Sequence, residues 1–140
     1  MPTVKISCFV DSNVLVYAAD PAEPAKWQLA TDLLRSLANS GTLVLSPQSL
    51  NESYVALTRK RRLPAEPVRS YLTNFVPFCT APYDFPVTAR AWLLQDKYGY
   101  PWWDCMLLAS AAIAGCNIFF SEDMQHRHQL EEMTIINPFQ

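Results

Sequence analysis

The feature that most limits the fold of this chain is a short apolar run that ends in a carboxylate. Residues 6–10 favour a strand, and Asp11, Ser12 and Asn13 follow directly. In parallel α/β folds, ligands bind beyond the carboxyl ends of the strands, where loops carry the reactive groups. Asp11 would stand at that edge, although Asp11 or Ser12 could equally be the N-cap of a helix over residues 14–19.

Strand-like and helix-like segments alternate along the rest of the chain. Helical spacing of apolar residues predicts helices over residues 24–39, 67–75, 86–98 and 102–114, and another that begins at Pro47 after the capping Ser46. Short apolar runs predict strands over residues 42–45, 117–120 and 133–136, with a possible edge strand over 77–81. This alternation indicates an α/β fold in which helices cover both faces of a mainly parallel sheet. At 140 residues, 50% of them hydrophobic, the chain fits one domain spanning residues 1–140.

The composition argues against a membrane-spanning protein and against a zinc site. No apolar run reaches the roughly 18–20 residues that span a bilayer, and no secretory signal is recognisable, so we expect a soluble, cytoplasmic protein without a membrane partner. The four cysteines lack the spacing of zinc ligands, which favours free thiols.

The net charge of −2 argues against a broad basic face for nucleic acid. A local basic cluster nevertheless occurs at Arg59, Lys60, Arg61 and Arg62. Such a run is usually a solvated helix end.

A second acid, Asp104, lies on an apolar helix face. Leu107, Leu108 and Ala111 follow it at helical spacing. A charge on that face costs several kcal/mol unless it is paired, hydrogen-bonded or bound to a metal. The alternative is a first-turn acid that the helix N-terminus favours.

Two further acids complete the set. Asp123 follows the expected strand 117–120 as Asp11 follows its strand, although Glu122 could be the inward group and a turn role is an alternative. Glu52 could belong to a capping box with Ser49. A helix that starts at Pro47 instead places Glu52 in the second turn, beyond capping reach.

Clustered carboxylates repel one another, so such a site either raises its pKa values or recruits cations. An all-oxygen site suits Mg²⁺ or Mn²⁺ better than zinc. These ions can activate a water and steady the leaving oxygen in phosphodiester hydrolysis.

Four short motifs in this order resemble the PIN-domain ribonucleases, and most of all the VapC-type toxins of bacterial and archaeal toxin–antitoxin pairs. The resemblance covers essentially the whole chain and rests on Val10-Asp11-Ser12-Asn13, Asn51-Glu52, Trp103-Asp104 with its alanine-rich helix, and residues 121–126 with the terminal Asn137-Pro138-Phe139.

The resemblance implies a division of roles among the residues. Asp11, Glu52, Asp104 and Asp123 would hold one or two Mg²⁺ or Mn²⁺ ions and orient the attacking water. Asn13 and Ser121 would support them.

The resemblance also implies a three-layer sandwich with a five-stranded parallel sheet, a homodimer, an RNA substrate and inhibition by a small cognate antitoxin protein. The cluster of residues 59–62 could bind phosphates, and Trp102 or Trp103 could stack a base. Adjacent tryptophans are more often core or dimer-interface residues. His126 and His128 are expected to be exposed turn residues.

The leading hypothesis is therefore a metal-dependent endoribonuclease toxin. One alternative is a non-catalytic PIN-like module that holds RNA or a protein in the same pocket. Another is a phosphotransfer domain with Asp11 as nucleophile, which the lack of a second acid in Asp11-Ser12-Asn13 disfavours.

Overall fold

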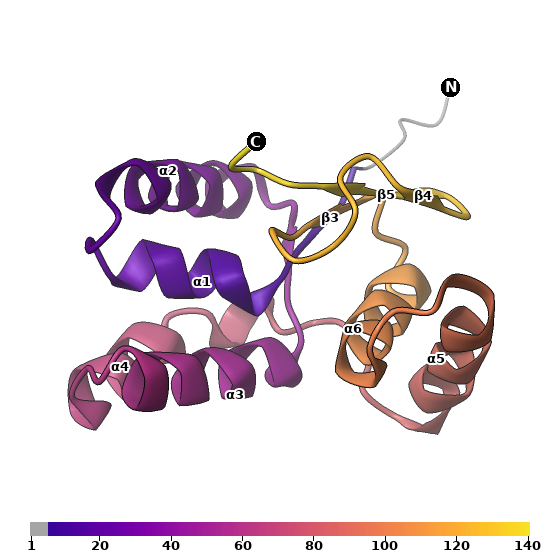
Figure 1. The fold of residues 1–140 in the computed structure, drawn as a ribbon, viewed down its shortest axis with the longest axis horizontal. Helices are drawn as coiled ribbons and strands as arrows, with labels where there is room; N and C mark the ends of the chain where they lie inside the picture. The colour runs from indigo at the N-terminus through magenta and orange to yellow at the C-terminus, as the bar shows by residue number, and fades with distance from the viewer. Residues whose placement is uncertain (1–5) are drawn as a thin grey trace.

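A five-stranded sheet lies at the centre of the computed structural model, which describes residues 6–140 (Figure 1). The strand order is β2-β1-β3-β5-β4. β1 pairs in parallel with β2 and β3, β3 pairs in parallel with β5, and only β4 runs antiparallel to its neighbour. The strands are β1 (Cys8–Val10), β2 (Leu43–Val44), β3 (Ile118–Phe120), β4 (Gln129–Leu130) and β5 (Met133–Ile136). The expected mainly parallel sheet is confirmed.

The helices also follow the sequence pattern. They are α1 (Ser12–Ala19), α2 (Pro24–Ser40), α3 (Pro47–Val55), α4 (Ala65–Thr73), α5 (Phe85–Tyr98) and α6 (Trp102–Ile113). Gly41 ends α2 with a φ of 73°, a conformation that glycine adopts without strain. The Ser46 side chain accepts a hydrogen bond from Gln48 N and caps α3, so Glu52 has no capping role.

Helices pack on both faces of the sheet, because side chains alternate along each strand. Cys8 and Val10 pack with α1 and α2, whereas Phe9 points to the other face and packs with α5 and α6. A smaller cluster joins α1 to α3 and α4 and consists of Val16, Leu57, Val68 and Leu72. All four cysteines are free thiols, as expected.

The strands differ from the expected ones in two places. Residues 77–81 form no strand: Pro77 and Phe78 belong to a 3₁₀ turn at Val76–Phe78, and Pro77 has no N–H to offer a ladder. This segment still exchanges two backbone hydrogen bonds with Leu45. Strand β4 was not expected, because two residues are too few to show a periodic pattern.

The strand order creates a switch point between β1 and β3. The chain leaves β1 for β2 on one side and later returns to β3 on the other side. In such sheets, the crevice beyond the carboxyl ends at the switch point is where ligands bind. Asp11 and Ser121 are the residues that directly follow β1 and β3. Within residues 6–140, no helix has both the length and the apolar character of a membrane span.

Candidate active site

Asp11 occupies the switch point and also caps α1. Its Oδ1 accepts a hydrogen bond from Ser12 N at 2.7 Å, and its Oδ2 accepts one from Ser121 Oγ at 2.8 Å. The residue is only 3% exposed. The sequence left open whether Asp11 caps a helix or faces a site at the edge of the sheet. The same carboxylate does both.

Burial raises the pKa of Asp11 to about 7. The hydrogen bond from Ser121 opposes this shift, and the negative charges of Glu52 and Asp104 add to it. A buried carboxylate without a nearby cation is costly to ionise, so Asp11 favours either a proton or a positive ion beside it.

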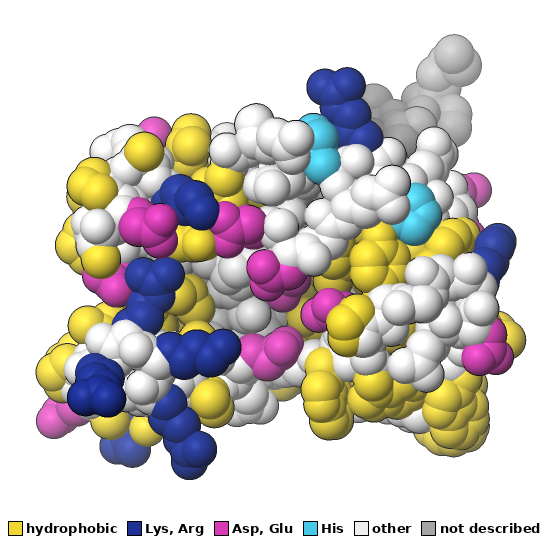
Figure 2. Space-filling view, viewed as in Figure 1, with side chains coloured by type: hydrophobic (Ala, Val, Ile, Leu, Met, Phe, Trp, Pro, Cys, Tyr) yellow, Lys and Arg dark blue, Asp and Glu magenta, His cyan; other side chains and the backbone are white. Residues whose placement is uncertain are grey.

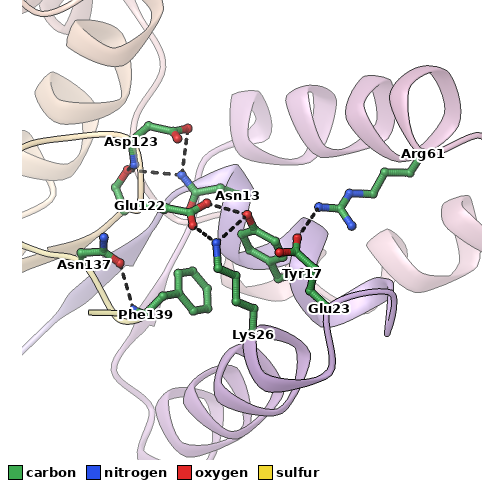
Figure 3. A network of polar contacts seen from close by, with 10 residues as sticks. Asn13, Tyr17, Glu23, Lys26, Arg61, Glu122, Asp123, Asn137 and Phe139 are labelled. Carbon is green, nitrogen blue, oxygen red and sulfur yellow. Dashed lines mark hydrogen bonds and ion pairs between the residues drawn. The ribbon is translucent and has the colours of Figure 1, made fainter.

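Asn13, in the first turn of α1, links this helix to the loop that follows β3 (Figure 3). Its Nδ2 donates to Asp123 Oδ2 at 3.2 Å and to Ser121 Oγ at 3.3 Å, and lies 3.5 Å from Asp11 Oδ2. Its Oδ1 accepts from Glu122 N at 3.3 Å. Asn13 and Ser121 thus both contact Asp11, and Asn13 also contacts the Asp123 carboxylate.

Glu52 on α3 and Asp104 in the first turn of α6 are both partly buried, which raises the pKa of each carboxyl. The charge of Asp104 raises the pKa of Glu52, and the charge of Asp123 raises both. The structure therefore brings the four predicted acids close enough to interact, although they come from separate elements of the chain.

The donor chemistry of these acids fits a hard divalent cation. Carboxylates that raise one another's pKa are stabilised by a positive ion, and oxygen ligands are those that Mg²⁺ and Mn²⁺ prefer. Within residues 6–140, however, no group of three or more His, Cys, Asp or Glu side chains is positioned to hold a metal ion. The chemistry of the donors, and not a preformed geometry, is therefore what fits a divalent cation.

Glu122 faces away from the other acids. Its carboxylate forms an ion pair with Lys26 and accepts a hydrogen bond from Tyr17 Oη at 2.7 Å. Burial alone would raise the pKa of Glu122, but Lys26 and Tyr17 hold it below its usual range. The Lys26 ammonium also lies 4.8 Å from the centre of the Tyr17 ring. Glu122 is therefore a structural anchor of the loop that carries Asp123.

A pocket of about 620 Å³ opens beside Asn13, Glu52 and Asp123. Lys60 and Arg61 also line it. They follow α3 through a π turn at Ala56–Lys60, whose extra residue shifts the side chains around the helix axis, as π turns at functional sites often do.

Only two of the four residues in the predicted basic cluster line this pocket. Arg59 and Arg62 are exposed and do not line the pocket. Arg61 is paired with Asp20, with 3.0 Å between Nη1 and Oδ2. Lys60 makes no ion pair within residues 6–140, so it is the pocket cation most available to a ligand.

A second pocket of about 620 Å³ lies on the other side of Glu52. Its lining residues are Pro47, Gln48, Asn51, Glu52, Tyr83 and Trp103, and Asn51 and Glu52 line both pockets. In Figure 2, basic side chains lie to the lower left of the acidic centre and hydrophobic side chains to its lower right. Sequence reasoning missed Gln48 and Tyr83, since a buried glutamine and a loop tyrosine show no periodic pattern.

The two histidines are not exposed turn residues, so that expectation is wrong. Both are partly buried. His126 Nδ1 accepts from Asn137 N at 2.9 Å, and His128 Nδ1 lies 2.6 Å from Tyr100 Oη. Both histidines lie in the loop between β3 and the hairpin of β4 and β5, and these two contacts hold that loop against the rest of the domain.

The adjacent tryptophans have different surroundings. Trp102 is partly buried and packs against the core between the sheet and α5 and α6. Trp103 is 59% exposed. Only Trp102 is therefore a core residue.

Comparisons with known proteins agree with this fold. The chain is similar to a solved structure described as a toxin–antitoxin complex from Klebsiella pneumoniae, with a TM-score of 0.65 and 15% identity over 94% of this chain and 98% of the other. It is also similar to VapC20 of Mycobacterium tuberculosis, described as a sarcin–ricin loop cleaving toxin, with a TM-score of 0.60 and 15% identity over 81% and 87% of the two chains. At this identity the likeness establishes the fold. A comparison with curated protein sequences finds no match. The sequence pattern of the PIN domain matches residues 8–129, and the chain belongs to the PIN-domain family.

Proposed function

We propose that this protein is a metal-dependent endoribonuclease that hydrolyses RNA phosphodiester bonds. The proposal rests on the place of four acids, Asp11, Glu52, Asp104 and Asp123, around the switch point of a PIN-domain sheet. Asn13 links Asp11 to Asp123, and Gln48 links Glu52 to the backbone of Trp103, which precedes Asp104. The structural similarity to VapC20, described as a sarcin–ricin loop cleaving toxin, supports RNA as the substrate class.

The four carboxylates would hold one or two Mg²⁺ or Mn²⁺ ions. Such ions, when bound, activate a water and stabilise the charge on the leaving oxygen. Ser121 and Ser12 hold the Asp11 carboxylate in place, and Asn13 positions Asp123. Lys60 would attract the RNA backbone to the pocket beside the acids.

The biological role that we propose is that of the toxin in a toxin–antitoxin pair, neutralised by a cognate antitoxin protein. The structural similarity to a toxin–antitoxin complex supports this role. We further propose that residues 1–140 form a single domain, that the protein is a homodimer, and that it acts in the cytoplasm, where its RNA substrate would be found.

One observation favours a second candidate function. Because the described acids are not positioned as a ready metal site, the pocket could hold RNA or a protein without cutting it. A phosphotransfer role has less support, since a nucleophile that is 3% exposed cannot easily reach a phosphodonor.

Removal of divalent ions distinguishes the two candidate functions. We expect EDTA to stop the cleavage of a cellular RNA pool by the wild-type protein, and added Mg²⁺ or Mn²⁺ to restore it, because the clustered carboxylates need a cation. Gel analysis of the RNA is the measurement, with a mock purification as control. Cleavage that persists in EDTA would contradict the metal-dependent mechanism, and metal binding without cleavage of any RNA would favour the binding module.

A further inference from the structure

The exposed side chain of Trp103 forms one wall of the pocket beyond Glu52. It is 59% exposed although it directly precedes Asp104. Tyr83 and Pro47 contribute further apolar surface to the same pocket. Large aromatic side chains that remain exposed in a concave site are typical of ligand-binding surfaces.

Gln48 holds this pocket in a fixed position relative to the acids. Its side chain is buried, and its Oε1 accepts a hydrogen bond from Tyr83 Oη at 2.7 Å. Its Nε2 donates to the Trp103 carbonyl oxygen at 2.9 Å and to Glu52 Oε1 at 3.1 Å. One carboxamide thus ties both aromatic residues to a carboxylate of the acidic site.

The surroundings of the pocket favour a flat, neutral ligand. Its charged lining residue is Glu52, which repels phosphate, and no cation lines it. The pocket on the other side of Glu52 also carries Glu122 and Asp123, but it is the one of the two that Lys60 and Arg61 line. A single-stranded RNA that crosses the acids can therefore place phosphates on the basic side and a base on the aromatic side. Asn51 is exposed in both pockets and offers a donor and an acceptor to a base edge.

We propose that the pocket of Pro47, Gln48, Asn51, Glu52, Tyr83 and Trp103 binds one unpaired nucleobase of the RNA, from a nucleotide next to the cleaved bond. The inference rests on the proposed function, because it assumes that RNA is the substrate. It adds a subsite that selects unpaired over paired RNA, since a base within a duplex cannot enter the pocket.

A binding experiment tests the pocket without requiring cleavage. A short single-stranded RNA carries 2-aminopurine at one position at a time, because the fluorescence of this base falls when it stacks on an aromatic ring. The protein is the Asp11→Asn variant, in which we expect no cleavage. We expect quenching at one position, its retention in Trp103→Phe and its loss in Trp103→Leu. Trp92→Leu is the matched control, since Trp92 is 50% exposed on α5, away from the pocket.

A cleavage experiment with the wild-type protein then uses an RNA that lacks the base at that position. We expect kcat/KM to fall roughly 10- to 100-fold, as for loss of one stacked base. In Trp103→Leu, the same base removal should cause little further loss, because the two changes remove one contact.

The outcomes separate this inference from the proposed function. Efficient cleavage that neither base removal nor Trp103→Leu alters would overturn the base pocket and leave the nuclease intact. Quenching that depends on Trp103, with no cleavage of any RNA by the wild type, would support the pocket and contradict the nuclease. Absence of quenching at every position, or a change in oligomer mass as the only effect of Trp103→Leu, would also overturn the pocket.

Discussion

Replacing Asp11 by asparagine should stop RNA cleavage and, in the same protein, raise the stability of the metal-free fold above pH 7. Asparagine keeps one oxygen, which can accept the hydrogen bond from Ser12 N, and its amide NH₂ can donate to Ser121 Oγ in place of the bond that Asp11 accepts. It removes the buried negative charge that a cation would need. We expect activity to fall by roughly 10²–10⁴-fold.

The stability effect follows from the direction of the pKa shift. Burial raises the pKa of Asp11 from 3.8 in a model peptide to about 7 in the folded protein. The folded state therefore retains the Asp11 proton longer than the unfolded state does, and the wild type loses stability as pH rises from about 4 to above 7. The loss can reach about 4 kcal/mol for a shift of this size. The Asp11→Asn variant has no carboxyl to ionise at this position, so it does not lose stability in this way as the pH rises.

Urea unfolding in EDTA at pH 5 and pH 8 measures the effect. The advantage of Asp11→Asn over the wild type should be larger at pH 8 than at pH 5. Asp96→Asn, an exposed change on α5, is the control and should behave as the wild type does. An advantage of Asp11→Asn that is equal at the two pH values would show that the Asp11 carboxyl has no raised pKa.

Replacing Asp104 by asparagine should abolish cleavage without lowering the stability of the fold. Asp104 is only partly buried, and within residues 6–140 its carboxylate accepts no side-chain hydrogen bond and forms no ion pair. The fold therefore does not depend on its charge, whereas the acidic site does. We expect a loss of roughly 10²–10⁴-fold in kcat/KM.

Cleavage rates of Asp104→Asn and of the control Asp96→Asn, together with their melting temperatures, test this prediction. Asp96→Asn makes the same chemical change on the neighbouring helix and should retain full activity. Full activity in Asp104→Asn would exclude Asp104 from the site.

The sequence predicted the elements of this fold well because their signals are local. Each long helix carries its own apolar stripe, and the caps at Ser46 and Gly41 mark helix ends within a few residues. The segment 77–81 was mispredicted because its conformation depends on a distant partner, Leu45. Two-residue strands such as β4 carry too few residues for any pattern.

The site was only partly predictable for the same reason. The acids could be named because each follows a strand or interrupts an apolar face. Their meeting depends on the pairing of β1 with β3, which brings Asp11 into contact with Ser121 across 110 positions of sequence. The choice between Glu122 and Asp123 depends on Lys26, which lies 96 positions from Glu122. The roles of Gln48 and Tyr83 likewise arise only from tertiary contacts.

Titration with Mn²⁺ tests most directly whether the four acids form one cation site. Electron paramagnetic resonance of free Mn²⁺ measures binding to the wild type, to Asp11→Asn, Glu52→Gln, Asp104→Asn and Asp123→Asn, and to the control Glu122→Gln. We expect the wild type to bind Mn²⁺, each of the four variants to lose at least about 10-fold in affinity, and Glu122→Gln to keep its affinity because Glu122 is held by Lys26 and Tyr17. Equal Mn²⁺ affinity in the wild type and the four variants would contradict a shared cation site.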